Sequence, residues 1–113
     1  MIRSKWLIPE EYKDLSIELL QENLPSLRAR VGISQEELAN VIGVSRQTYY
    51  SIEAGKRDML WCTYLTLMFF FNSIDRTAEM IRDLRVYPID LVMRFNDELT
   101  PEQMDKMLAE IRR

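Results

Sequence analysis

Four residues with hydrogen-bonding side chains lie close together near the middle of the sequence, namely Arg46, Gln47, Tyr50 and Ser51. An arginine matches the two acceptors on the edge of guanine and a glutamine matches adenine, whereas tyrosine and serine hydroxyls suit a phosphate or a base. Their spacing places them on one face of a helix. The group predicts contacts with nucleic-acid bases, and the alternative is a set of solvated helix residues.

The sequence gives little support to a catalytic function. The sequence has no histidine and one cysteine, Cys62, so it lacks a disulfide pair and a Cys/His set for zinc. It has no glycine-rich phosphate loop and no nucleophile signature. We therefore expect no enzyme activity, no metal and no cofactor. The cysteine content fits a cytoplasmic location, and Cys62 is expected to be a small core residue.

The charge distribution is compatible with a nucleic-acid partner although the formal net charge is −3. Residues 24–61 carry five basic and four acidic groups. Residues 1–23 carry three basic and five acidic groups, and residues 62–113 carry seven basic and nine acidic groups. Because the local distribution matters more than the sum, the acidic total does not exclude such a partner.

Two short helices are predicted around the four polar residues. Ser34 followed three residues later by Glu37 is a capping box, so a helix should start at Ser34 and run to about Ile42. Gly43 suits a sharp left-handed turn. Ser45 can then cap a second helix that extends to about Glu53 and ends at Gly55. The pattern is a helix-turn-helix, and in DNA-binding versions the second helix enters the major groove.

The remaining sequence predicts an all-α protein, because apolar residues recur at helical spacing and alternating runs are absent. One helix should start near Pro9, and a second should follow Asn23 as its N-cap, with Pro25 in its first turn, and end at Gly32. Later helices are expected over 61–71, after a cap at Ser73 or Asp75, over 88–96, and after the cap Thr100 with Pro101 and Gln103. We predict three parts: a helical extension over 1–23, a helix-turn-helix domain over 24–72, and a helical extension over 73–113. No apolar run approaches the length of a membrane span, and the N-terminus does not look like a signal peptide.

An ordered signature runs through the central segment. It comprises Gln35, Leu38, Ala39, Gly43, Val44, Ser45, Arg46, Gln47, Thr48, Ile52, Glu53, Gly55 and Arg57. On these residues the stretch resembles the lambda-repressor-like, XRE-type helix-turn-helix regulators. The resemblance covers roughly residues 20–72. It implies a five-helix helix-turn-helix domain, here with extra N- and C-terminal helices, that binds double-stranded DNA and regulates transcription.

The resemblance also implies roles for individual residues. Arg46, Gln47, Tyr50 and Ser51 fall on base-reading positions. Gln35, Thr48 and Lys56 fall where phosphate contacts are common, and Arg57 is assigned to a phosphate on electrostatic grounds. Arg28 and Glu53 match a buried salt bridge that aligns the recognition helix. Tyr49 stands where the family usually has an aliphatic residue, and its ring can be buried with the hydroxyl at an edge.

The expected partners are double-stranded DNA and a second copy of the chain. A homodimer through the flanking helices over 74–113 would give operator-grade affinity. The alternative is an antitoxin-like module that binds another protein and uses the helix-turn-helix as a scaffold. A small-molecule sensor is a further alternative. The aromatic residues that could line its pocket are more simply core, although a run of three phenylalanines cannot all face one side: Trp61, Tyr64, Phe69, Phe70 and Phe71. A C-terminal apolar stripe suits either a core or a dimer seam: Met104, Met107, Leu108 and Ile111.

Overall fold

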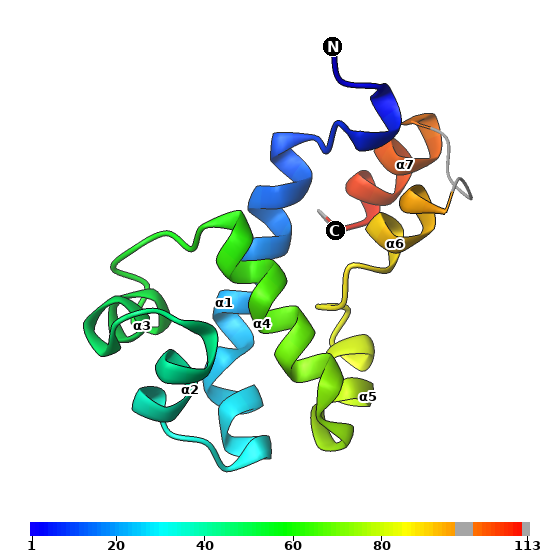
Figure 1. Ribbon diagram of the computed structural model, residues 1–113. Coiled ribbons are helices and arrows are strands. Elements are labelled where there is room, and N and C mark those ends of the chain that lie inside the picture. The colour runs from blue at the N-terminus through cyan, green and yellow to red at the C-terminus, as the bar shows by residue number, and fades with distance from the viewer. Residues whose placement is uncertain (97–100, 112–113) are drawn as a thin grey trace. The chain divides into compact units, whose positions relative to one another are not determined.

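The computed structural model describes residues 1–96 and 101–111, apart from the side chains of residues 101, 104 and 107. These residues form seven α-helices and a short 3-10 helix, without a strand, which confirms the all-α prediction. Figure 1 shows their order along the chain. The elements are η1 (Ser4–Trp6), α1 (Glu10–Val31), α2 (Gln35–Ile42), α3 (Arg46–Glu53), α4 (Trp61–Ser73), α5 (Asp75–Asp83), α6 (Ile89–Phe95) and α7 (Pro101–Ile111).

The chain divides into two compact units, and α1 contributes residues to both. One unit comprises residues 17–87, and the other comprises residues 1–16 and 88–113. The boundaries of these compact units differ from the predicted domain boundaries at 23/24 and 72/73. The predicted domain boundaries stay a prediction.

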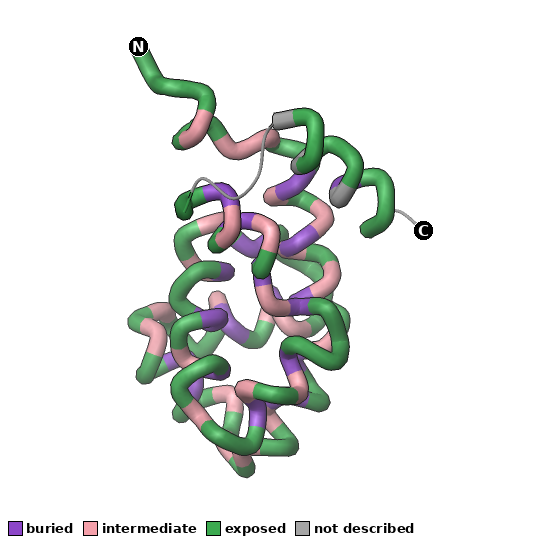
Figure 2. The backbone as a smooth tube through the Cα atoms, turned by 90° about the vertical axis from the view of Figure 1, so that its right-hand side faces the viewer, coloured by how far each residue is buried: buried purple, intermediate pink, exposed green. Residues whose placement is uncertain are grey.

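The unit of residues 17–87 is built around one apolar core. Helix α2 packs on α3 and α4, and α4 packs on α5. Figure 2 shows that the buried positions alternate with exposed ones along each helix, as expected for amphipathic helices. The buried residues of this core are Leu20, Leu24, Leu27, Leu38, Ala39, Tyr49, Ile52, Met59, Tyr64, Leu67, Met68, Phe71, Ile81 and Val86.

The predicted helix break near Asn23 is wrong, because α1 continues through it. The Asn23 amide donates to the carbonyl of Leu19 at 2.8 Å, within the helix, instead of capping a new one. Pro25 lies inside α1 and has no N–H to give to the carbonyl of Gln21. An internal proline costs about 3 kcal/mol. Three fully buried leucines on the core face of α1, each worth about 2 kcal/mol, offset that cost: Leu20, Leu24 and Leu27.

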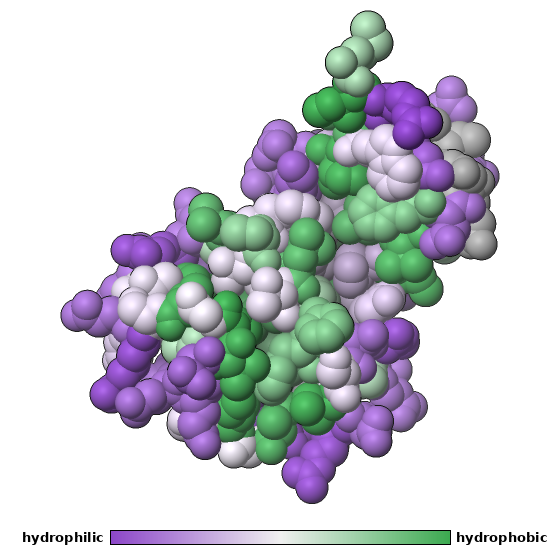
Figure 3. Space-filling view, in the orientation of Figure 1, coloured by the Kyte–Doolittle hydropathy of each residue, from purple (hydrophilic) through white to green (hydrophobic). Residues whose placement is uncertain are grey.

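The apolar helix predicted over 61–71 is confirmed as α4, but it does not bury all its apolar residues. Tyr64 and Phe71 are fully buried, whereas Phe69 is 76% exposed. Cys62 is also exposed, so its assignment to the core is wrong. Since the core contacts one face of α4, residues on its opposite face stay at the surface. Figure 3 shows apolar side chains gathered over α4.

The start of α5 differs from the prediction. The N-cap is Ile74, with no side-chain cap, and neither Ser73 nor Asp75 fills that role. The Ser73 hydroxyl instead donates to the carbonyl of Phe69 at 2.6 Å. Buried Thr77 donates to the carbonyl of Phe71 at 2.7 Å, which ties the first turn of α5 to the end of α4.

The second unit contains η1, α6, α7 and the first turns of α1. The predicted helix over 88–96 is confirmed as α6, which packs on η1 and α7. Arg94 is 5% exposed and donates to the carbonyls of Ser4, Lys5 and Leu7. The last predicted helix is confirmed as α7 and begins at Pro101.

The predicted cap and stripe of the last helix lie partly outside the described residues. Thr100, and with it the predicted capping box with Gln103, lies outside them. The side chains of Met104 and Met107 are likewise outside them. Of the rest of the stripe, Leu108 is buried and Ile111 is 37% exposed.

Candidate nucleic-acid interface

The start of α2 is held by a reciprocal cap, as the sequence predicts. The Ser34 hydroxyl accepts from the N–H of Glu37 at 3.0 Å, and the Glu37 carboxylate accepts from the N–H of Ser34 at 2.9 Å. The backbone N–H of Ser34, and then its hydroxyl, hold the pKa of the Glu37 carboxyl below its usual range. Two donors at the helix start are thereby satisfied.

A left-handed glycine makes the turn between α2 and α3. Gly43 has φ +84° and donates its N–H to the carbonyl of Ala39 at 3.0 Å, and the N–H of Val44 donates to the same oxygen. A residue with a Cβ rarely adopts this conformation. The turn lets α3 pack on α2, with Tyr49 and Ile52 buried beneath it.

The N-terminal end of α3 is organised by hydroxyl groups. Ser45 accepts from the N–H of Thr48 at 3.0 Å and donates its own proton to the Thr48 hydroxyl oxygen at 2.8 Å. Arg57 donates to the same oxygen at 3.3 Å. Thr48 accepts both bonds, and a hydroxyl that accepts can also donate its own proton to a further acceptor.

The residues predicted to read bases lie together on the surface side of α3. Arg46, Gln47 and Tyr50 are exposed, and Ser51 is half-buried. Tyr50 has 55% of its surface accessible. The outer face of α3 thus carries donors and an aromatic ring within two turns.

The structure brings Arg28, Glu53 and Tyr49 into one polar cluster. Arg28 donates to the two oxygens of Glu53 at 2.8 Å and 2.7 Å, in a bidentate arrangement, and to the carbonyl of Ile33 at 3.1 Å. The hydroxyl of fully buried Tyr49 donates to Glu53 at 2.6 Å. The cluster connects α1 with the last turn of α3, and bidentate geometry adds orientation to the attraction.

The pKa values of this cluster follow from its geometry. Burial acts to raise the pKa of Glu53, but hydrogen bonds from Arg28 and Tyr49 outweigh it and lower the pKa below the usual range. Gln35 adds a smaller lowering of the same pKa. Burial, and then the bond to Glu53, raises the pKa of Tyr49. Tyr49 is therefore a neutral donor and Glu53 an ionised acceptor near neutral pH.

The candidate phosphate residues come from three places. Gln35 is half-buried at the start of α2, Thr48 is half-buried in the first turn of α3, and Lys56 and Arg57 are exposed in the loop after α3. The N–H groups of Lys56 and Arg57 both donate to the carbonyl of Ser51, at 2.9 Å and 3.2 Å. The loop is thus folded back onto the end of α3.

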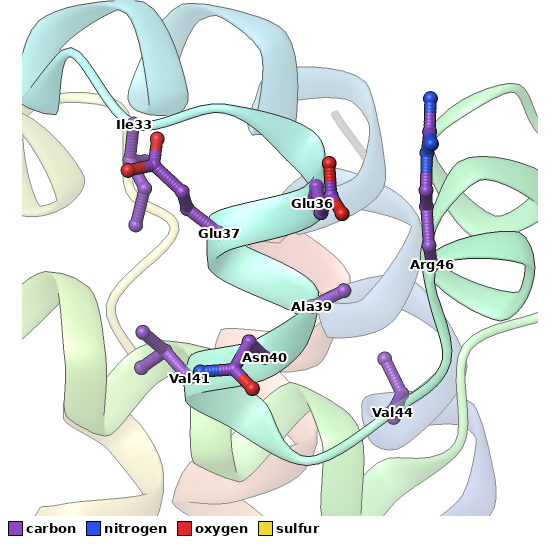
Figure 4. Close-up of a pocket in the computed structure, with 8 residues that line it drawn as sticks. All are labelled: Ile33, Glu36, Glu37, Ala39, Asn40, Val41, Val44 and Arg46. Carbon is purple, nitrogen blue, oxygen red and sulfur yellow. The ribbon is translucent and has the colours of Figure 1, made fainter.

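An open pocket lies between α2 and the start of α3 (Figure 4). Its lining residues are Ile33, Glu36, Glu37, Ala39, Asn40, Val41, Val44 and Arg46. Figure 4 shows Glu36 and Arg46 projecting in the same direction. A carboxylate that lines the same pocket as Arg46 can accept a hydrogen bond from the amino group of cytosine. Glu36 was not identified from the sequence, where it reads only as an acidic residue in the first turn of a helix.

This pocket gives no support to an aromatic effector site. None of the five aromatic residues considered for such a site lines it.

Within the described part of the chain, no group of three or more His, Cys, Asp or Glu side chains is placed to hold a metal ion. Among the described helices, none is long and apolar enough to cross a membrane.

A family model described as helix-turn-helix matches residues 26–58. The match contains α2, the Gly43 turn, α3 and the loop that follows. Residues 26–58 are therefore a helix-turn-helix domain of the XRE, lambda-repressor-like type, which suggests DNA binding. Domains of this type are typically non-enzymatic. Neither the curated proteins nor the solved structures include a match to the chain.

Proposed function

We propose that the protein is a cytoplasmic transcriptional regulator that binds double-stranded DNA in a sequence-specific way, with α3 in the major groove. The observation that carries the proposal is the two-sided character of α3. Tyr49 and Ile52 are buried, while Arg46, Gln47 and Tyr50 face solvent. A major groove admits one helix and distinguishes all four base pairs by their donors and acceptors.

In this proposal the outer face of α3 divides its work between bases and backbone. Arg46 and Gln47 lie in the first turn of α3, where side chains that read base edges gather. Tyr50 and Ser51 lie one turn further along and complete the base-reading set. Their contacts supply the preference for one sequence over another.

Phosphate contacts are assigned to the residues that surround this face. Thr48 has a hydroxyl proton to donate, and Arg57 bonds to Thr48, so the two lie side by side. Lys56 precedes Arg57 in an exposed loop, and Gln35 stands at the start of α2. These contacts fix the register of α3 on the duplex and carry most of the dependence on salt.

We further propose that the chain acts as a homodimer through its flanking helices. One helix-turn-helix makes few contacts, whereas a two-fold pair reads half-sites about 34 Å apart. An apolar face on α6 supports this location. Ile89, Val92 and Phe95 occur every third residue of α6 and are all exposed, at 55%, 38% and 41%. Exposed apolar side chains that recur along one helix are typical of an interface.

The test is selection of bound duplexes from a random DNA pool, followed by a salt titration on the winning sequence. A palindromic site whose affinity falls steeply with salt is the expected result. Arg46→Ala should relax the preference at one base position, with a loss of about 1–3 kcal/mol on the preferred site. Arg76→Ala, which removes an exposed arginine from α5, is the matched control and should leave the preference intact.

Failure to enrich any sequence would overturn the proposal. Sedimentation distinguishes a homodimer through the α6 face from a complex with a different protein. A dimer at micromolar concentration is expected. A monomer with and without DNA would contradict the homodimer, and a stoichiometric complex with a different protein would favour the antitoxin-like alternative.

A further inference from the structure

Gln21 makes a contact with the recognition helix that the domain match does not cover. It lies on α1, outside residues 26–58. Its Nε2 donates to the carbonyl of Ile52 at 3.0 Å and to the carbonyl of Arg57 at 3.0 Å. A carboxamide nitrogen has two hydrogens, so both of its donors are used. One side chain thereby joins the last turn of α3 to the loop after it.

The loop that Gln21 holds is short and has a defined shape. Gly55 has φ +76°, and its N–H donates to the carbonyl of Ile52 at 3.1 Å. Lys56 and Arg57 donate their N–H groups to Ser51. These bonds satisfy carbonyls that are left open at the end of a helix. The bond to the Arg57 carbonyl is different, because it ties the middle of the loop to another helix.

We propose that Gln21 is a positioning residue for the phosphate contacts. By fixing the backbone of Arg57, it holds the side chains of Lys56 and Arg57 at the edge of the face that α3 presents. Without that bond, ordering the loop would be a cost of DNA binding instead of a property of the free protein. This inference rests on the proposed DNA binding. It identifies Gln21 as the residue that orders the phosphate-binding loop before DNA binds.

The geometry also predicts what Gln21 does not do. Its contacts are with the carbonyl of Ile52 in the last turn of α3 and with a carbonyl in the loop after it, whereas the base-reading residues start in the first turn of that helix. Removal of the Gln21 amide should therefore weaken binding to all sequences by a similar factor. The base preference should stay as it is, since phosphate contacts carry no direct sequence information.

The test compares Gln21→Met, which keeps the length and loses both donors, with Ser26→Met at an exposed site on the same helix. The first readout is amide hydrogen exchange over residues 54–58 in the free protein. Gln21→Met should speed exchange there while the α4 core keeps its protection, and Ser26→Met should change neither. Gln21→Lys restores a donor to the two carbonyls and should return exchange to near the wild-type rate.

The second readout is DNA affinity as a function of salt on the selected site. Gln21→Met should bind roughly three- to tenfold more weakly, as expected for one lost hydrogen-bonded link. The slope of log affinity against log salt should fall in magnitude by about one, as for one lost phosphate contact. The sequence selected from a random pool should not change.

The outcomes separate this inference from the proposed function. Unchanged exchange over residues 54–58 in Gln21→Met overturns the inference without reference to DNA. Faster exchange with an unchanged affinity and salt slope overturns the positioning role and leaves DNA binding intact. A wild-type protein that binds no duplex overturns the proposed function itself, and the role of Gln21 in it.

Discussion

Arg28 and Arg94 each hold the end of a helical segment, one in each compact unit, but their surroundings differ. Arg28 donates to both oxygens of Glu53 and keeps 20% of its side chain accessible. Arg94 is buried, and its described partners are backbone carbonyls of η1 and of Leu7, the residue after it. Arg28 is thus tied to a group that can lose its charge in acid, and Arg94 to groups that cannot.

The chemical type of the partner determines how each contact responds to mutation and to pH. A carboxylate partner makes the Arg28 contact strong and directional, and also sensitive to acid. Carbonyl partners match the negative end of a helix and do not titrate. The contact of Arg94 is therefore local and insensitive to pH, whereas the contact of Arg28 joins two helices of the domain that carries the recognition surface.

The largest effect is expected from Glu53→Ala. The change leaves Arg28 and the Tyr49 hydroxyl without their partner, and breaking a buried pair of this kind costs about 3 kcal/mol. The melting temperature should fall accordingly. DNA affinity should be lost, because α3 is no longer aligned. Glu79→Ala, at an exposed site on α5, is the control. If Glu53→Ala melts and binds like the wild type, the pair has no aligning role.

A smaller and more local effect is expected from Arg94→Met. The variant loses bonds to three carbonyls, and a hydrogen bond to a charged group contributes about 2 kcal/mol. Hydrogen exchange should accelerate at the N–H groups of Trp6 and Leu7, which close η1. Exchange within residues 17–87 should stay the same. Protection at Trp6 and Leu7 that survives the substitution would show that η1 does not depend on Arg94.

Acid titration should separate the two arginines. The folded pKa of Glu53 lies below its unfolded value of 4.5, so its stabilising contribution is complete above that value. The contribution is lost as the pH falls through the lower, folded pKa. Stability measured by denaturant titration should therefore drop less steeply below pH 4.5 in Glu53→Gln than in the wild type. Arg94→Met should keep the wild-type slope, and a matching change of slope in both variants would contradict the comparison.

The pH dependence of the stability contributed by Asp90 should have the opposite sign to that of Glu53. It should also be the smallest of these effects. Burial, and then the negative charge of Glu110, raise the pKa of Asp90. The ionised form is therefore disfavoured in the folded protein, and the associated stability is lost as the pH rises through the folded pKa. Asp90→Asn should gain up to about 0.5 kcal/mol at neutral pH and nothing in acid. Glu102→Gln, which changes an exposed carboxylate in the same unit, should show no such gain. A loss of stability in Asp90→Asn at neutral pH would refute the assignment.

The parts of the fold that the sequence predicted depend on neighbours within a few residues. Ser34 with Glu37, and Ser45 before α3, are caps whose partners lie three residues away. Gly43 makes its turn through its own backbone freedom. The predicted start of α5 failed because Ser73 and Asp75 are plausible caps by type, while the actual geometry is fixed by Thr77 against α4.

The candidate interface divides in the same way. The helical spacing of Arg46, Gln47 and Tyr50 predicted that they share one face, and helix periodicity alone determines that. Gln21 could not be predicted, because its partners lie 31 and 36 residues away and no local pattern marks a glutamine for carbonyls that distant. The same reason applies to Glu36, whose relation to Arg46 depends on how α3 crosses α2.

By itself, the sequence determined the helix-turn-helix: its caps, its glycine turn and the residues on the outer face of α3. Those features arise from hydrogen bonds and backbone preferences within single turns, which composition and spacing encode directly. Three features became visible only in the folded chain: α1 continues past Pro25, Phe69 and Cys62 face outward, and Gln21 reaches the loop after α3. Each of these depends on which helix face meets the core, and that choice is made by packing between segments far apart in the chain.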